Sequence, residues 1–256
     1  FHDRVGTGVF NQLSHVCLVL LLICPGLAIS TEKLSMATSN GPPYMIQSSD
    51  SGLDIDIPRE ALRRAGYELT IRYMPLARAR VEVQSRRIDL TAPFFTEGAE
   101  GLYLSEPHVM YRPTAFSLAS RNLKVNTLQD LKGLRVQTFQ GASRYFGQEY
   151  VEVTALSLTY EERPDMSRLV LALASGRTDV VVLDYNIFSY FWNRSIGESK
   201  NVQLRSHQIF PPVAAVVAFN NAEIRDKYNK GLRAMIRDGT HLKLMNRHVQ
   251  SLPILK

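Results

Sequence analysis

The sequence predicts an α/β fold made of two similar lobes, and three observations lead to this fold class. Short apolar strands alternate with helices of about ten residues along most of the chain. One local pattern, a helix end followed by a basic turn, an aspartate and an apolar strand, occurs around Asp89 and again 90 residues later around Asp179. Two strand-like segments flanked by proline, 114–119 and 213–219, would connect the lobes.

Length and composition are those of a globular chain. The 256 residues are 45% hydrophobic and 21% charged, and no long low-complexity run interrupts them. The net charge of +6 is a mild excess. These values exclude a mainly disordered or fibrous chain, and the hydrophobic content is sufficient for a packed core.

The first 30 residues are expected to be a signal peptide. The apolar run Val16–Cys24 has nine residues, whereas a bilayer-spanning helix needs about 20, and a breaking Pro25-Gly26 pair follows it. A short buried helix is the alternative. Both cysteines, Cys17 and Cys24, lie in this segment, so the mature chain would have no thiol. Since Cys24 follows a bulky isoleucine rather than a small residue, we expect a soluble, periplasmic protein without a lipid anchor.

Hydrophobic periodicity places the elements of the first lobe. A turn at Ser39–Pro43 separates the first strand from a helix that begins near Asp56 and ends at Gly66. The predicted strands are 34–38, 68–73 and 88–91, and the second helix is 76–86.

The second lobe repeats this order. Its predicted helices are 128–131, 142–150 and 166–174, and its strands are 134–138 and 179–183. Because βαβ units produce parallel strands with helices on both faces, we expect two parallel sheets.

The lobes are expected to bind a ligand between them. Lobe one would comprise 31–115 and 215–256, lobe two 116–214, and a helix at 222–238 would return the chain to lobe one. Two lobes joined by two hinge strands form a clamp whose cleft is the expected site.

Six short motifs in this order resemble a known family. They are Leu34–Thr38 with Pro42–Tyr44, Gly52–Ile57, Arg86–Leu90, Leu104–His108, Leu128–Val136 and Ser175–Asp184. From about Lys33 to His248 the chain resembles the extracellular solute-binding proteins of family 3, periplasmic receptors that deliver amino acids and related solutes to ABC importers. The resemblance implies a type II periplasmic-binding-protein fold, a small polar solute and a membrane permease as partners, a monomer, no cofactor and no catalysis.

The resemblance also implies ligand-binding residues. Tyr44 would lie on the ligand, the turn that contains Ala142 and Ser143 would hold a carboxylate through its N–H groups, and Asp184 would accept an ammonium group. The alternatives are a half-buried loop tyrosine, an ordinary N-cap serine and a cap for the helix beginning at Tyr185.

One departure from the family pattern concerns the carboxylate. The family usually places a carboxylate-binding arginine shortly after a threonine, but the corresponding stretch 94–99 contains none. Arg78 or Arg144 could replace it, or both could be solvated helix residues. Three further residues, at the carboxyl end of a lobe-one strand, are expected to line the cleft: Thr91, Pro93 and Phe94. The adjacent pair Phe94-Phe95 suggests an apolar cleft wall, and the alternative is that the two rings pack under the lobe.

Other functions have less support. The mature chain has no nucleophile elbow, phosphate loop, dinucleotide motif or zinc motif, and its four histidines are scattered. The arginines of 78–87 read as the solvated face of a helix rather than a nucleic-acid site. Two alternatives remain: an exported enzyme on the same fold, similar to cyclohexadienyl dehydratases and using Glu97, Glu100 or Asp184, and a protein that presents its ligand to a membrane sensor.

Overall fold

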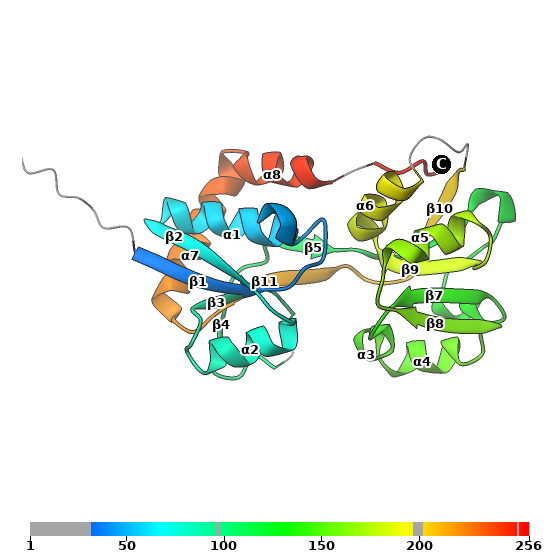
Figure 1. Cartoon of the computed structure of the whole chain (residues 1–256), viewed down its shortest axis with the longest axis horizontal. Coiled ribbons are helices and arrows are strands. Elements are labelled where there is room, and N and C mark those ends of the chain that lie inside the picture. The colour runs from blue at the N-terminus through cyan, green and yellow to red at the C-terminus, as the bar shows by residue number, and fades with distance from the viewer. Residues whose placement is uncertain (1–31, 96–97, 197–201, 250, 256) are drawn as a thin grey trace, which may run out of the picture. The chain divides into compact units, whose positions relative to one another are not determined.

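Two separate β-sheets organise the chain, and helices cover both faces of each (Figure 1). The structure is a computed structural model that describes residues 32–95, 98–196, 202–249 and 251–255. The expected signal peptide and the residues Thr96 and Glu97 lie outside the described residues. Among the described residues, no helix has both the length and the apolar character needed to cross a bilayer.

The first sheet has a parallel centre and antiparallel additions. Strands β2, β1 and β3 are parallel, and β11 then runs antiparallel to β3. In spatial order its strands are β2 (Tyr67–Tyr73), β1 (Glu32–Thr38), β3 (Leu90–Phe94), β11 (Val213–Phe219) and β4 (Tyr103–Leu104), while β5 (Val109–Tyr111) pairs with β11 beyond this path.

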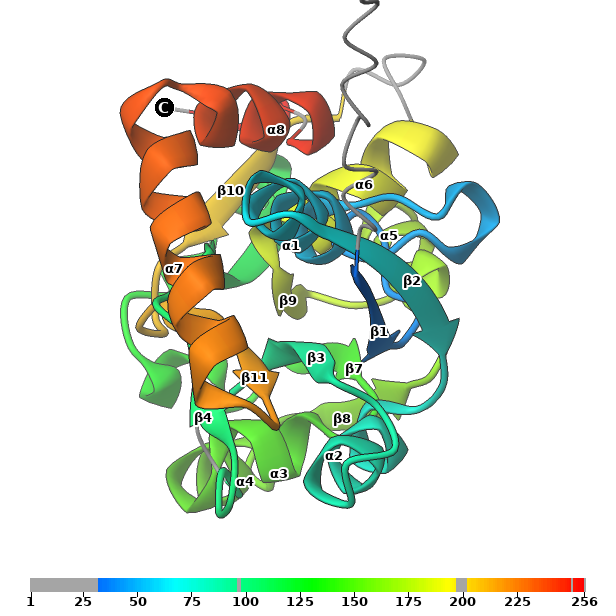
Figure 2. The same ribbon diagram turned by 90° about the vertical axis from the view of Figure 1, so that its left-hand side faces the viewer.

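Alternation along β1 sends successive side chains to opposite faces of the first sheet. Met36 joins the core beneath α1 (Leu53–Arg64) and α7 (Ala222–Arg237), whereas Ala37 packs against α2 (Leu76–Gln84). Figures 1 and 2 both show α1 and α2 on opposite sides of this sheet. Helix α8 (Thr240–His248) and a 3₁₀ turn (Gln47–Ser49) complete the described elements of lobe one.

The second sheet is built in the same way. Strands β8, β7 and β9 are parallel, and β6 runs antiparallel to β9. The spatial order is β10 (Leu204–His207), β6 (Pro113–Leu118), β9 (Val180–Asp184), β7 (Arg135–Phe139) and β8 (Thr159–Arg163).

Strand β9 divides the core of lobe two. Val181 and Leu183 pack with α5 (Ser167–Ala174) and α6 (Tyr185–Ser195), and Val180 and Val182 belong to the opposite core. The helices on that opposite side are α3 (Ala142–Phe146) and α4 (Gln148–Thr154), and two 3₁₀ turns (Ala119–Arg121, Leu128–Leu131) precede β7.

The repeated pattern around Asp89 and Asp179 forms the same hydrogen bond in both lobes. Asp89 Oδ2 accepts a hydrogen bond from the N–H of Ser35 on β1 (2.7 Å), and Asp179 Oδ2 accepts one from the N–H of Arg135 on β7 (2.9 Å). Each aspartate thus ties the start of the third parallel strand to the first.

Three expectations about the elements need correction. The sheets are mixed rather than fully parallel, because β6 and β11 enter their sheets antiparallel. The chain crosses between the sheets at Arg112 and in 208–212, just before the segments 114–119 and 213–219 that were expected to cross. The helix expected at 142–150 is broken at Gly147, whose φ of 82° is left-handed.

The last described residues return to lobe two rather than lobe one. The N–H of Leu204 donates to Pro253 O (2.9 Å), and the N–H of Leu255 donates to Leu204 O (2.8 Å). Leu252 and Ile254 pack on the core beneath α5 and α6. The edge of β10 leaves backbone groups unpaired, and this short segment satisfies them.

Candidate functional site

A cavity of about 410 Å³ lies where the two lobes face each other. Its lining is mostly apolar and aromatic. Lobe one contributes Ser39, Asn40, Gly41, Met45, Leu76, Pro93, Phe95 and Tyr111, and the segment 113–187 of lobe two contributes Pro113, Phe139, Gln140, Tyr145, Phe146, Met166, Leu183, Asp184 and Ile187.

Tyr145 is the centre of the aromatic lining. Its ring lies edge-on to Phe95 from the other lobe (centroids 6.1 Å apart), to Phe139 (5.7 Å) and to Phe146 (5.0 Å). Burial and the nearby Asp184 carboxylate raise the pKa of Tyr145 to about 12, so its phenol stays neutral at physiological pH. These edge-to-face contacts hold the aromatic side chains of the two lobes against one another at the cavity.

Tyr44 lies behind this lining and is fully buried. Its ring stacks on Tyr111 at 3.9 Å between centroids. Its hydroxyl donates to Asp184 Oδ1 (2.9 Å) and accepts from Asn186 Nδ2 (3.0 Å). Tyr44 therefore positions Tyr111 and Asp184, and it is not among the residues that line the cavity, so its expected contact with the ligand stays a prediction.

Asp184 lines the cavity but is only 6% exposed, and both of its oxygens already accept hydrogen bonds. Oδ1 accepts from the Tyr44 hydroxyl and from the N–H groups of Asn186 and Ile187, and Oδ2 accepts from the Arg112 N–H (2.6 Å). The helix-cap role considered from the sequence is therefore present at the start of α6. Burial raises the pKa of Asp184 above its ordinary value, although these donors oppose the shift.

A buried polar pair fixes the lobe-one wall from behind. The Tyr111 hydroxyl donates to Asp54 Oδ2 (2.5 Å), and His108 Nε2 lies 2.7 Å from Asp54 Oδ1. Both Asp54 and His108 have fully buried side chains. Burial raises the pKa of Tyr111 well above its ordinary value, so its phenol remains a donor that fixes the ring orientation.

The turn expected to hold a ligand carboxylate holds a carboxylate of the protein. The N–H and the hydroxyl of Ser143 donate to Glu162 Oε1 (2.8 and 2.5 Å), and the Gly141 N–H donates to Glu162 Oε2 (2.7 Å). The Tyr160 hydroxyl also donates to Oε1 (2.8 Å). Burial raises the pKa of Glu162, but these donors outweigh burial and lower it to about 2.

Of the remaining expected site residues, only Pro93 lines the cavity. Thr91 and Ala142 are buried in the lobes, and Phe94 packs with Val216 and Ala218 beneath lobe one. Phe94 is the last residue of β3, and its neighbour Phe95, directly after the strand, lines the cavity.

Neither arginine considered as a carboxylate partner lines the cavity. Arg78 is exposed and pairs with Glu82 on the next turn of α2 (3.4 Å). Arg144 is exposed on α3. A different arginine, Arg80, lies over the Phe94 ring at 5.4 Å, outside the lining.

Sequence reasoning identified Phe95 as a possible wall residue but missed the other four aromatic residues of the lining. Tyr145 and Phe146 directly follow the predicted turn at Ser143, and this adjacent aromatic pair is the signal that could have identified them. Tyr111 ends a three-residue strand, too short to give a periodic pattern.

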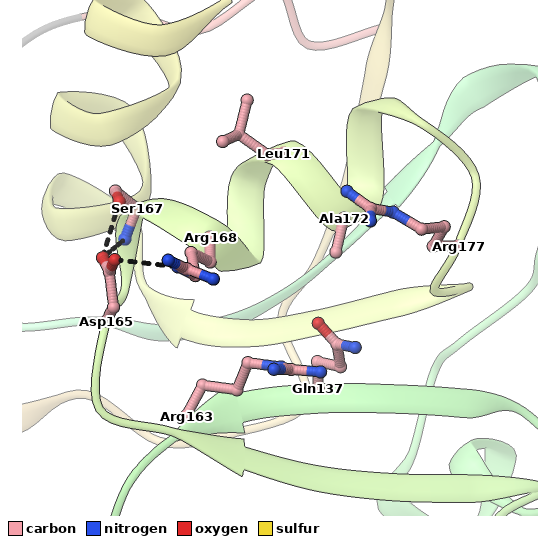
Figure 3. Close-up of a pocket in the computed structure, with 8 residues that line it drawn as sticks. All are labelled: Gln137, Arg163, Asp165, Ser167, Arg168, Leu171, Ala172 and Arg177. Carbon is pink, nitrogen blue, oxygen red and sulfur yellow. Dashed lines mark hydrogen bonds and ion pairs between the residues drawn. The ribbon is translucent and has the colours of Figure 1, made fainter.

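A second depression, of about 480 Å³, is confined to lobe two between α5 and strands β7 and β8 (Figure 3). Three of its charged residues form ion pairs, since Arg168 pairs with Asp165 (3.3 Å) and Arg163 pairs with Glu161. The fourth, Arg177, donates a hydrogen bond to Ser175 Oγ (3.0 Å). Because lobe one contributes nothing to it, motion between the lobes would not open or close it. Within the described ranges, no group of three or more His, Cys, Asp or Glu residues could hold a metal ion.

Comparison with known proteins agrees with this architecture. The arginine-binding extracellular protein ArtP of Bacillus subtilis (strain 168) is 23% identical over 222 residues, which are 83% of this chain and 84% of ArtP. The solved structure of an ancestral cationic amino acid solute-binding protein superposes with a TM-score of 0.70 at 18% identity, over 87% of this chain and 97% of that one. The L-arginine-bound AbpA of Streptococcus pneumoniae gives a TM-score of 0.64 at 17% identity, over 87% and 98% of the two chains.

The family is identified by sequence as well as by fold. The family model described as bacterial extracellular solute-binding proteins, family 3, matches residues 34–251, nearly all of the chain that follows the expected signal peptide. The two-lobed structures above share the same mixed α/β architecture. The chain therefore belongs to the bacterial extracellular solute-binding proteins of family 3.

Proposed function

We propose that this protein is an exported receptor that captures a small polar solute between its lobes and delivers it to an ABC-type importer. The observation that carries the proposal is the cavity of about 410 Å³ lined from both lobes by aromatic side chains. A solute there would contact Phe95 and Tyr111 on one side and Tyr145 on the other, so binding would favour closure of the lobes.

The relatives support this proposal. ArtP is an arginine-binding extracellular protein, and AbpA is the substrate-binding protein of an amino acid ABC transporter. Receptors of this kind act outside the cytoplasmic membrane, which agrees with residues 1–30 serving as a signal peptide and with delivery to a membrane permease.

The positions and hydrogen bonds of the acidic residues considered from the sequence support ligand binding rather than catalysis. Among the described residues of the cavity lining, Asp184 is the one acid, and both of its oxygens are occupied by donors. Glu100, another acid considered from the sequence, is exposed and is not part of the lining. A general acid or base needs a free oxygen within hydrogen-bond reach of the substrate.

The test is a thermal-shift screen of the purified protein against amino acids, amines and small carboxylates, followed by calorimetry on each hit. Tyr145→Ala should weaken binding of the best hit at least tenfold, which corresponds to about 1.4 kcal/mol. Tyr103→Ala is the matched control, because Tyr103 is an exposed lobe-one tyrosine outside the cavity. A hit bound equally well by both variants would place the site elsewhere.

A further inference from the structure

The carboxylate-binding groups near the cavity are already in use. Glu162 extends from β8 to the turn before α3 and accepts hydrogen bonds from the Gly141 N–H, from the N–H and hydroxyl of Ser143, and from the Tyr160 hydroxyl. A ligand carboxylate at this turn would have to displace a carboxylate held by four donors, and it would remain beside the displaced negative charge.

No other group in the lining replaces them. In the described part of the chain, the lining contains no lysine, arginine or histidine, and Arg78 and Arg144 lie outside it. The polar side chains that remain belong to Ser39, Asn40 and Gln140, apart from Asp184 and the tyrosine hydroxyls. An α-carboxylate enclosed here would lose its water without gaining a cationic partner, and that loss is unfavourable.

The same lining is suited to a positive charge. Five aromatic residues contribute to it, and ring faces attract cations. Asp184 adds a buried carboxylate at one end, and Glu162 adds a second negative charge at the neighbouring turn. The electrostatic field from the described neighbours therefore favours an ammonium or guanidinium group and disfavours a carboxylate.

From these observations we infer that the solute is an organic amine without a carboxylate group, carried on an apolar or aromatic body that fits among Phe95, Tyr111 and Tyr145. This inference rests on the proposed function and narrows its solute class. It differs from the binding of an ordinary amino acid, in which the carboxylate must be held as well as the amine.

Compounds that differ by one group at a time test the inference. Calorimetry on the full mature chain would compare three compounds with the same phenol ring. Tyrosine carries both the amine and the carboxylate, tyramine carries the amine alone, and 4-ethylphenol carries neither. Two further pairs, arginine with agmatine and lysine with cadaverine, extend the comparison of amino acid and decarboxylated amine to aliphatic side chains. We expect at least one amine to bind tenfold or more tightly than its amino acid, and tyramine to bind more tightly than 4-ethylphenol if the aromatic body is preferred.

Substitution of Glu162 tests the cause. In Glu162→Ala the turn donors are free, so the preference of the best amine over its amino acid should fall at least fivefold. Glu162→Gln removes the charge and keeps one acceptor oxygen, while its NH2 group would replace the oxygen that accepts from the Gly141 N–H. It therefore tests the effect of the charge if the alanine variant fails to fold. Glu149→Ala, an exposed acid of α4 outside the site, should leave the preference unchanged.

The outcomes separate this inference from the proposed function. If amino acids bind at least as tightly as their decarboxylated partners, the receptor function stands and the inference is wrong. Equal binding of 4-ethylphenol and the best amine would also overturn it, because the positive charge would then contribute nothing. If no compound in either panel binds, it is the proposed function that fails. An unchanged preference in both Glu162 variants would overturn the assigned cause.

Discussion

The hydroxyl of Tyr44 donates a 2.9 Å hydrogen bond to Asp184, and this bond joins two residues that are 140 positions apart and belong to different lobes. Asn186 donates to the same hydroxyl from the first turn of α6. The contact is buried and lies directly behind the cavity wall, so the polar groups that join the lobes also fix the shape of the site.

Removal of this hydroxyl should weaken the contact between the lobes. Tyr44→Phe keeps the ring stacked on Tyr111 but leaves Asp184 with one donor fewer, and we expect a loss of about 1 to 2 kcal/mol in the free energy of unfolding. Urea titration measures the loss, and small-angle scattering should show a larger radius of gyration without ligand. Tyr103→Phe is the control, and equal stability and scattering for the two variants would contradict the prediction.

Glu162 should make the protein less stable in acid. Its pKa in the folded protein is about 2, below its ordinary 4.5, so its ionised form stabilises the fold above that ordinary value. This stabilisation should disappear as the pH falls from about 4.5 through 2. Because the group is partly exposed, we expect about 1 to 2 kcal/mol.

Urea titrations at pH 7 and at pH 2.5 measure this contribution. The Glu162→Gln variant should be less stable than the natural sequence at pH 7, and the difference should shrink at pH 2.5. An equal difference at the two pH values would show that the ionised carboxylate does not stabilise the fold.

Gly231 permits the close crossing of α1 and α7. A Cβ at this position would lie 2.2 Å from the carbonyl oxygen of Ala61, so Gly231→Ala should push the helices apart. In an exposed helix the same change would stabilise by about 1 kcal/mol, but here we expect a destabilisation of about 2 kcal/mol or more. Thermal unfolding of Gly231→Ala would measure this loss of stability, with Lys230→Ala, at an exposed neighbouring position, as the control. A raised melting temperature for Gly231→Ala would contradict the packing argument.

The segment 251–255 should contribute to the stability of lobe two. Ile254 packs on the core beneath α5 and α6, so Ile254→Asp should lower the free energy of unfolding by about 2 kcal/mol. Leu255→Asp should have little effect, because that side chain is exposed. Hydrogen exchange of the β10 amides provides a local measurement, and equal exchange in the two variants would count against the packing role.

Much of the fold could be predicted because the central strands and helices have clear periodicity. Strand β11 and helices α2 and α7 lie where the pattern places them, within a residue or two. Strands β4 and β5 have two and three residues, too few for a pattern to emerge. Strand β8 was missed because it is a polar edge strand with the sequence TYEER, without an apolar alternation.

The candidate site was harder to predict because it depends on distant pairings. The resemblance identified both Tyr44 and Asp184, but their mutual hydrogen bond depends on how the lobes meet. Glu162 reaches the Ser143 turn because β7 and β8 pair with Thr138 opposite Glu162, a register that the sequence does not reveal. Nothing in the sequence separates Phe94 from Phe95, because β3 ends at Phe94 and, of the pair, only the residue directly after the strand lines the cavity.

The matching aspartates Asp89 and Asp179 have a consequence for how such a receptor can change. Each closes an independent three-strand module, and the module ends, rather than its interior, supply the walls of the cavity. Mutations of rim residues that make no contact across the lobes can therefore alter which molecules are admitted without disturbing the opposite half, so selectivity can evolve one wall at a time.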